Sequence, residues 1–395
     1  MSNDATADLK FCPICRGVGQ PLLSLPAQPI YQHPVPHNAV VPEPHLIDLG
    51  WDFCTECAHA WQPEFDARLL ENIYRSHYYT PAPEGIGMLF RNDFLAALEA
   101  IGVGATPRVL LEIGASDGDV LAELKRRTGA SLAYAFEPNR ENAAIARQRG
   151  LDVRESFFGA DAAGQGMEAV DLVYSRHVIE HVFDLESFFG GLDAVATPEA
   201  DLVLETPSLD YHALSGSIAP FHIEHLHVFA LRSLALLAHI HHWELKDSVV
   251  SSSGNLIAAF SRGTASVDIP APYLGGLQAT LEEQRAHLRE LFAGRRMIFW
   301  GAGSAGIGLA NTIGREPDIW TDGNPNKIGK RFVGAMRRIV SPENALAQAA
   351  TRDREEAILV IASSFASEIL PQVQKFGWQG DVYNLTGTRL LARQS

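Results

Sequence analysis

Residues 220–227, Pro-Phe-His-Ile-Glu-His-Leu-His, bring three histidines and one glutamate into six consecutive positions. A histidine beside a glutamate can act as a general base near neutral pH, with the carboxylate holding the imidazole in one tautomer. Because adjacent residues point in different directions, Glu224 can orient His225 only if the backbone is irregular there. Two other interpretations stay open: a helix start with solvated histidines, and a metal site built from His222, His225 and His227.

The four cysteines form two pairs near the start of the sequence, Cys12-Pro-Ile-Cys15 and Cys54-Thr-Glu-Cys57. Each pair has the spacing of a knuckle that grips a metal ion, and two knuckles complete a tetrahedral four-sulfur site. Such a site has no open coordination position, so the pattern predicts a structural zinc ion. Disulfides or free thiols are the alternative, and His59 could replace one thiolate.

The net charge of −15 over 395 residues argues against a nucleic acid or an anionic membrane as partner. The sequence has no apolar run near the ~18 residues of a membrane span. Its first residues, Met-Ser-Asn-Asp-Ala-Thr, lack the basic and apolar regions of a signal peptide. We therefore expect a cytoplasmic protein.

A strand, a glycine-bracketed turn and a helix are the elements that must position a ligand beside these groups. Residues 109–113 form an apolar run typical of a strand buried on both faces, and Gly114 and Gly118 bracket the turn that follows. The helix after it directs backbone N–H groups and a positive dipole end at one point. The turn is not a phosphate loop, since it lacks Gly-Lys-Ser/Thr and the acidic Glu112 and Asp117 would repel phosphate.

A second buried strand, residues 132–136, ends in Glu137, whose carboxylate suits the two hydroxyls of a ribose. The pair of strands resembles class I S-adenosylmethionine-dependent methyltransferases, whose first strand ends in E-x-G-x-x-x-G and whose second ends in an acid. The resemblance implies a methyl-donor site formed by Glu112, Gly114, Ser116, Gly118, Glu137, Pro138 and His177. A nicotinamide-type Rossmann turn, or a turn without a ligand, is the alternative.

The remaining pattern predicts an α/β protein with a seven-stranded, doubly wound class I methyltransferase sheet. The further strands are expected at residues 153–156, 171–175, 201–205, 244–250 and 256–261, with helices at 140–149, 185–196 and 231–240. Ligands of such sheets lie beyond the carboxyl ends of the strands. We predict three domains: a small zinc-binding domain (1–68), the methyltransferase core (69–267) and a smaller Rossmann-like domain (268–395).

The Rossmann-like pattern restarts after a proline- and glycine-marked linker at residues 270–276 and a charged helix at 277–292. Gly301, Gly303 and Gly306 form a G-x-G-x-x-G turn, and Asp322 follows at the distance of a dinucleotide fingerprint. Because this turn comes after the methyl-donor turn, we expect the last domain to serve the acceptor or the fold. Binding of a second cofactor is the alternative.

The order of modules resembles the sugar C-methyltransferases of antibiotic deoxysugar pathways, which methylate carbon 3 of a 4-keto nucleotide sugar. The shared features are the C-x-x-C pairs, the methyltransferase core, a Glu-His-Leu segment after the fifth strand and a terminal Gly-Ala-Gly domain. The active-site residues that the resemblance implies are Glu180, His181, Glu224, His225 and either Tyr78 or Tyr79. The family's terminal signature appears as residues 322–329, Asp-Gly-Asn-Pro-Asn-Lys-Ile-Gly.

The sequence departs from that family where the acceptor is held. His222 stands in place of the usual tyrosine, and Ala305 in place of a common lysine. Residues 253–255, Ser-Gly-Asn, replace Gly-Gly-Ser, and Ile257 replaces the arginine that usually follows. The resemblance therefore supports the fold of this family, but it does not identify the sugar.

Methylation of carbon requires a base that removes a proton next to a carbonyl, and a donor to the enolate oxygen. We hypothesise that His225 is the base, that Glu224 orients it, and that His222 or His181 donates to the oxyanion. The acceptor implied is a nucleotide sugar. An O- or N-methyltransferase of another sugar or small metabolite is one alternative, and a nicotinamide-dependent redox or non-catalytic binding protein is another.

Overall fold

The computed structural model describes residues 10–41, 43–76, 86–103, 106–215, 217, 219–265, 277–351, 357–363, 366–385 and 387–392. These residues form two compact units. The first contains Met1–Leu22, Gly50–Tyr211 and Glu224–Leu274, and the second contains Leu23–Leu49, His212–Ile223 and Gly275–Ser395. Residues Leu23–Leu49 thus cluster with the C-terminal part of the chain, although they lie between the two cysteine pairs in sequence.

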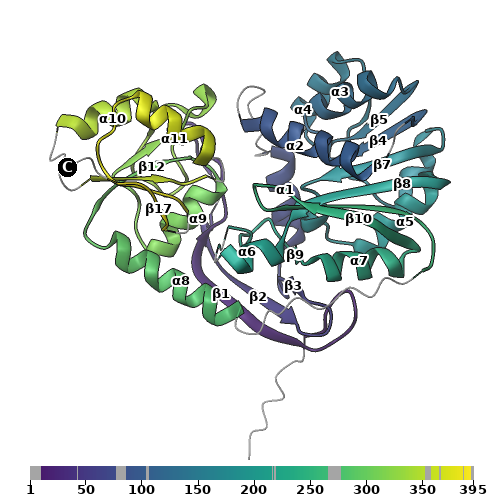
Figure 1. Cartoon of the computed structure of the whole chain (residues 1–395), viewed down its shortest axis with the longest axis horizontal. Coiled ribbons are helices and arrows are strands. Elements are labelled where there is room, and N and C mark those ends of the chain that lie inside the picture. The colour runs from purple at the N-terminus through teal and green to yellow at the C-terminus, as the bar shows by residue number, and fades with distance from the viewer. Residues whose placement is uncertain are drawn as a thin grey trace, which may run out of the picture. The chain divides into compact units, whose positions relative to one another are not determined.

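The first unit is built on a seven-stranded mixed sheet (Figure 1), with strand order β10-β11-β8-β7-β4-β5-β6. The strands are β4 (Val109–Ile113), β5 (Leu132–Phe136), β6 (Asp152–Arg154), β7 (Val170–Arg176), β8 (Ala196–Pro207), β10 (Trp243–Val250) and β11 (Asn255–Arg262). Strands β4 to β8 pair in parallel, whereas β11 is antiparallel to both β8 and β10. This topology is the class I methyltransferase fold, which confirms the predicted fold class.

The apolar run of β4 is buried because helices cover both faces of the sheet. Leu110 packs in one cluster with α2, α3 and α4, whereas Val109, Leu111 and Ile113 pack in another with α5 and α7. Alternate strand residues point to opposite faces, so the four apolar residues of this five-residue strand can fill both layers, while Glu112 is the one polar member. The helices of this unit are α1 (Ala67–Ser76), α2 (Ile86–Ile101), α3 (Asp119–Thr128), α4 (Arg140–Gln148), α5 (Leu185–Val195), α6 (Leu209–Ser215) and α7 (Leu231–Ile240), with short 3₁₀ turns η1 (Ala160–Gln165) and η2 (Ile179–His181).

A four-stranded sheet has the order β1-β2-β3-β9; Cys54 ends β2, Cys57 lies in the turn to β3, and Cys12 and Cys15 precede β1. Its strands are β1 (Gly19–Pro29), β2 (Leu46–Cys54), β3 (His59–Trp61) and β9 (His227–Phe229). Strand β9, which follows the histidine-rich segment, pairs antiparallel with β3. Two segments far apart in sequence therefore share one hydrogen-bonded edge.

The second unit contains a six-stranded, mostly parallel sheet, with the order β14-β13-β12-β15-β16-β17. Its elements are α8 (Leu277–Phe292), β12 (Arg296–Trp300), α9 (Ser304–Ile313), β13 (Ile319–Thr321), η3 (Pro325–Lys327), β14 (Ile339–Val340), α10 (Pro342–Thr351), β15 (Ala357–Ile361), α11 (Ala366–Lys375), β16 (Val382–Tyr383) and β17 (Arg389–Leu391). The strand–turn–helix of β12 and α9 is the predicted Rossmann-like unit.

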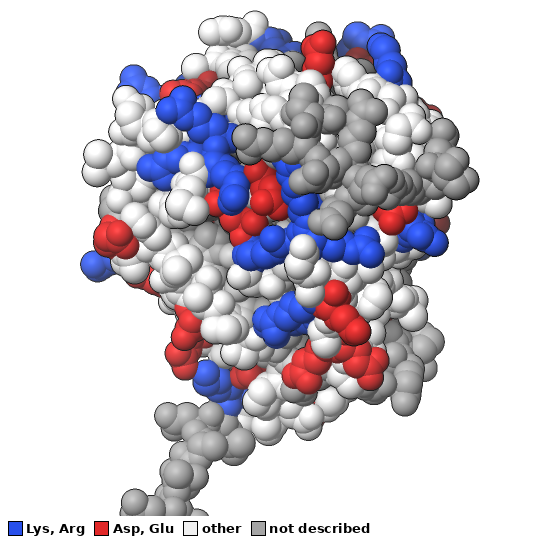
Figure 2. Space-filling model, turned by 90° about the vertical axis from the view of Figure 1, so that its left-hand side faces the viewer, with Lys and Arg blue, Asp and Glu red and all other residues white. Residues whose placement is uncertain are grey.

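Acidic and basic side chains are intermingled on the face shown in Figure 2. In the second unit Glu316 and Asp318 pair with Arg337, and Asp381 lies near Arg295 and Arg389. Among the residues that the structure describes, no helix has the length and apolar character needed to cross a membrane.

Candidate active site and four-cysteine cluster

The turn after β4 has the left-handed backbone that its glycines predict. Gly114 and Gly118 have φ angles of 76° and 73°, and Ser116, which is not a glycine, has a φ of 50°. The N–H groups of Gly114 and Ala115 donate to the carbonyl of Phe136, which ties the turn to the end of β5. The backbone is thereby held open toward the carboxyl edge of the sheet.

Glu137 joins the two turns through its side chain. Its Oε2 accepts a 2.8 Å hydrogen bond from the Ser116 N–H, and its Oε1 accepts a 2.7 Å bond from the Asn139 N–H. Burial raises the pKa of Glu137 to about 7, although these two backbone donors act to lower it. Each carboxylate oxygen has two lone-pair sites, so both oxygens can still accept a hydroxyl from a ligand.

A cavity of about 290 Å³ lies at the ends of the central strands, within the first unit. Of the predicted donor residues, Gly114, Glu137, Pro138 and His177 line it, and the predicted catalytic residue His181 lines it as well. The lining that the sequence did not predict includes Glu71, Tyr74, Phe157, Phe158, Val178, Phe183 and Asp184. The cavity combines apolar and aromatic walls with a few polar groups, which is typical of a small-molecule site.

Glu112 lies within β4, buried beneath the turn. Its Oε2 accepts a 3.1 Å hydrogen bond from the Tyr174 hydroxyl. Burial raises the pKa of Glu112 to about 8, opposed by the nearby charge of Arg176. These contacts give Glu112 a structural position next to the donor turn.

His177 follows β7 with a left-handed φ of 52°. Its Nδ1 lies 3.3 Å from Glu180 Oε1, and its Nε2 lies 3.3 Å from the side-chain amide nitrogen of Asn255. Burial acts to lower the pKa of His177, but the hydrogen bond with Glu180 and the charges of Glu205 and Glu180 raise it overall. His177 is thus fixed between the Glu180 carboxylate and the Asn255 amide at the cavity wall.

The predicted catalytic pair lies beside His181. The rings of His181 and His225 pack edge to face with centroids 4.9 Å apart. His181 Nδ1 lies 2.6 Å from the backbone carbonyl oxygen of Glu224, and the Tyr74 hydroxyl donates to the same oxygen over 3.1 Å. Burial lowers the pKa of His181 and raises that of Glu224 to about 7. The Nδ1–H donation to this carbonyl leaves the lone pair of His181 on Nε2.

Of the other predicted catalytic residues, the structure describes His222. His222 belongs to the second unit, where it lines a cavity of about 30 Å³ together with Phe221, Ser304 and Ala305. Tyr78 and Tyr79 lie outside the described residues. Tyr74, near the end of α1, is a described tyrosine that lines the cavity, and its closeness in sequence to Tyr78 and Tyr79 is a signal that could have indicated it.

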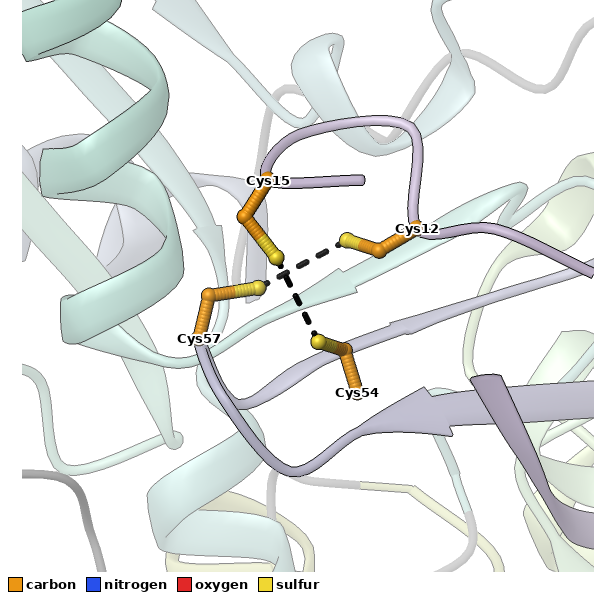
Figure 3. A group of neighbouring side chains, drawn as sticks. All are labelled: Cys12, Cys15, Cys54 and Cys57. Atoms are coloured by element: carbon orange, nitrogen blue, oxygen red, sulfur yellow. Dashed lines mark hydrogen bonds between the residues drawn. The ribbon is translucent and has the colours of Figure 1, made fainter. Parts of the chain in front are cut away.

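The four cysteines converge at one point of the first unit (Figure 3). Cys12 and Cys57 have their sulfur atoms 3.6 Å apart, and those of Cys15 and Cys54 are 3.4 Å apart. Four sulfurs at about 2.3 Å from a shared ion would be separated by roughly 3.8 Å, so the arrangement fits a tetrahedral ion closely. His59 does not join this cluster; its Nε2 lies 3.0 Å from His227 Nδ1.

A second cluster with ligand spacing among the described residues is Glu180, His181 and His225. The predicted metal set of His222, His225 and His227 is not among the groups that the described residues bring within ligand distance. His227 Nε2 instead lies 3.1 Å from the Val182 carbonyl oxygen.

The acid of the C-terminal fingerprint, Asp322, accepts hydrogen bonds from other residues of its own chain. Asp322 Oδ2 accepts from the Ala302 N–H at 2.8 Å and from Lys327 Nζ at 3.0 Å, and its Oδ1 accepts from the Asn324 N–H at 2.8 Å. In a dinucleotide site this acid binds a ribose hydroxyl. Here it holds the turn between β12 and α9.

Residues 90–245 match the family described as "Methyltransferase domain". With the sheet topology and the donor turn, this match defines the class of the protein: it is an S-adenosylmethionine-dependent methyltransferase. The C-methyltransferase NovU of Streptomyces niveus is 25% identical over 305 residues, which cover 67% of this chain and 71% of that protein.

Solved structures with a similar fold include two methyltransferases bound to S-adenosylhomocysteine. The magnesium protoporphyrin IX methyltransferase of Synechocystis PCC 6803 has a TM-score of 0.38 and 15% identity, and the match covers 50% of this chain and 100% of that one. The 1,6-didemethyltoxoflavin-N1-methyltransferase of Burkholderia thailandensis has a TM-score of 0.33 and 17% identity, with 47% and 92% covered.

Replacement of Gly114 by alanine is expected to damage both the fold and the donor site. Its φ is 76°, and an added Cβ would collide with Val178 Cγ2 in the cavity wall. The left-handed strain costs about 1–2 kcal/mol and the overpacking about 1–3 kcal/mol. Calorimetry should show at least a tenfold loss of affinity for S-adenosylhomocysteine. Gly129→Ala is the matched control, since its φ is 73° and an added Cβ would meet nothing within 4 Å; equal losses in both variants would contradict the assignment of Gly114.

Proposed function

We propose that the protein transfers a methyl group from S-adenosylmethionine to a carbon next to the carbonyl of a keto nucleotide sugar. The observation that carries the proposal is the cluster of His181, Glu224 and His225 beside the donor cavity. Methyl transfer to oxygen requires little beyond alignment, whereas methyl transfer to carbon requires a base. The relative named as a C-methyltransferase supports the same choice.

In this proposal the donor supplies an already activated methyl group, and the protein prepares the carbon that receives it. His225 removes the proton next to the carbonyl, and the electron pair of that C–H bond moves toward the carbonyl oxygen to form an enolate. His181 supports this step through its fixed tautomer and its contact with the His225 ring. The enolate carbon then attacks the methyl group in line with the breaking S–C bond, and S-adenosylhomocysteine leaves.

The four-cysteine cluster would hold one zinc ion in this proposal. Its sulfur separations of 3.4 and 3.6 Å support a tetrahedral ion, and four thiolates leave no position for a substrate. The ion would hold together the turns that carry Cys12–Cys15 and Cys54–Cys57, next to strand β3.

Nicotinamide-dependent redox chemistry has less support. The acid expected to bind a dinucleotide ribose, Asp322, already accepts three hydrogen bonds from its own chain, one of them from the buried Lys327 ammonium. Glu137 accepts two, both from backbone N–H groups. We therefore propose that the C-terminal unit serves the acceptor, as the family resemblance implies.

Binding of the donor nucleoside should weaken below about pH 7. The ionised Glu137 accepts the ribose hydroxyls, and burial raises its pKa to about 7. Because protonation of the carboxylate removes this acceptor, affinity should be highest above pH 7 and fall by up to tenfold per pH unit below it. Calorimetry with S-adenosylhomocysteine from pH 5.5 to 8.5 measures this, and Glu137→Gln should bind weakly with a flattened profile. An unchanged slope in that variant would remove Glu137 from the site.

The acceptor is tested by mass spectrometry with nucleoside diphosphate 4-keto sugars and S-adenosylmethionine. Incorporation of one methyl group on carbon, together with solvent deuterium exchange at that carbon without the donor, is the expected result. Methylation on oxygen or nitrogen without exchange would favour the alternative methyltransferase. Binding of NADH in preference to S-adenosylhomocysteine would overturn the proposal as a whole.

A further inference from the structure

The backbone of residues 224–226 is held by side chains and backbone donors from two directions. The Glu224 carbonyl accepts from Tyr74 and His181, as described above. The next carbonyl, that of His225, accepts a 2.9 Å hydrogen bond from Gln62 Nε2 and a 3.4 Å bond from the Trp51 indole. The Gln62 backbone N–H then donates to the Leu226 carbonyl over 2.9 Å.

Gln62 and Trp51 both belong to the four-cysteine module, by which we mean residues 10–22 and 50–64 of the first unit. Trp51 lies in β2 just before Cys54, and Gln62 directly follows β3, which pairs with β9. Both side chains are almost fully buried, with 4% of Gln62 and 1% of Trp51 exposed. A buried amide is costly unless it is hydrogen-bonded, so the bond to the His225 carbonyl defines where the Gln62 side chain can lie.

A fixed carbonyl restricts the backbone dihedrals of its own residue, and these aim the side chain. The His225 ring must keep a fixed position beside His181 if it is to act as the proposed base. A displacement of about 1 Å in a reacting group can lower a rate by roughly 10²-fold. The hydrogen bond from the Gln62 amide to the His225 carbonyl therefore helps to set the position of the His225 imidazole.

We propose that Gln62 is a positioning residue that aims His225 from the four-cysteine module, with Trp51 as a weaker second donor. This inference rests on the proposed role of His225 as base. If Gln62 positions His225, the four-cysteine module contributes to catalysis as well as to the fold.

Gln62→Met tests the proposal, because methionine nearly matches glutamine in shape but has no N–H donor. With a nucleoside diphosphate 4-keto-6-deoxysugar as the probe, kcat should fall about 10- to 100-fold. KM and the dissociation constant of S-adenosylhomocysteine should stay within twofold, since Gln62 does not line the donor cavity. Gln20→Met is the control, because Gln20 is an exposed glutamine of the same module.

The second readout needs no acceptor. In ¹H–¹³C spectra of histidine-labelled protein, the His225 ring signals should shift in Gln62→Met, because the edge-to-face contact with His181 is lost, and stay unchanged in Gln20→Met. Should Gln62→Met fail to fold, Gln62→Asn keeps a buried amide but withdraws it by one methylene, and the same shift is expected. Unmoved His225 signals together with wild-type kcat would overturn the proposal. If the wild-type protein fails to methylate the probe, the acceptor class is wrong, while the ring signals still decide the role of Gln62.

Discussion

His225→Gln is expected to lower turnover by about 10²- to 10⁴-fold, the usual contribution of a positioned base. Glutamine preserves the polar character and most of the volume of the site, but it cannot take a proton. The dissociation constant of S-adenosylhomocysteine should remain near the wild-type value, because His225 does not line the donor cavity. Steady-state rates and calorimetry measure the two quantities separately.

Deuterium exchange at the acceptor carbon gives this prediction a sharper form. Wild-type protein should exchange the proton next to the carbonyl without any methyl donor, and His225→Gln should not. His287→Gln is the control, since His287 is an exposed histidine of α8. Full exchange by His225→Gln would show that another residue is the base. His181 would then be the first candidate, because its Nε2 carries the lone pair.

Cys54→Ser, or treatment with a strong chelator that removes the proposed zinc ion, is expected to abolish turnover. Cys54 is fully buried, and a four-thiolate zinc site contributes apparent binding energies of about 10–16 kcal/mol to the segments that it joins. Without the ion, the turns beside β3 lose their anchor, and with it the donors that hold the His225 backbone. None of the four cysteines is among the described residues that line the donor cavity, so donor binding should survive in part.

Metal analysis and activity on the same samples measure this second prediction. One zinc ion per wild-type chain and none in the variant is the expected content, with loss of activity in proportion to loss of metal. Lys10→Ala provides the control, because it removes an exposed salt bridge to Glu64 in the same module without touching a thiol. Full turnover by a metal-free protein would show that the ion bound by the cysteines is needed for neither the fold nor catalysis.

The sequence predicted the methyltransferase sheet well because its signals are local. The apolar run of residues 109–113, the glycines at 114 and 118, and the acid at 137 each depend on backbone geometry within a few residues. The strand predicted at residues 153–156 is shorter in the structure and ends at Arg154, while the strand predicted at 201–205 extends to Ala196–Pro207. Such differences at strand ends come from pairing partners, which a single sequence does not show.

The active-site surroundings were harder to predict because they depend on contacts between distant segments. The pairing of β9 with β3 joins residues 227–229 to 59–61, and Gln62 reaches His225 from 163 positions away. Nothing in the spacing of Gln62 distinguishes it from an ordinary buried residue. The clustering of Leu23–Leu49 with the C-terminal unit was missed for the same reason, since a proline-rich segment has no periodicity that indicates its partner.

The left-handed backbone of Ser116 and His177 has a consequence for engineering. Both are non-glycine residues at the ends of neighbouring strands, and each such conformation costs on the order of 1–3 kcal/mol. A selection for heat tolerance should therefore reach Ser116→Gly early, because glycine relieves the conformational cost. At His177 the same exchange would also remove the imidazole that lies between Glu180 and Asn255. The buried Glu180 carboxylate would then lose this partner, at a cost of about 3–5 kcal/mol that exceeds the relief, so heat selection should leave His177 unchanged.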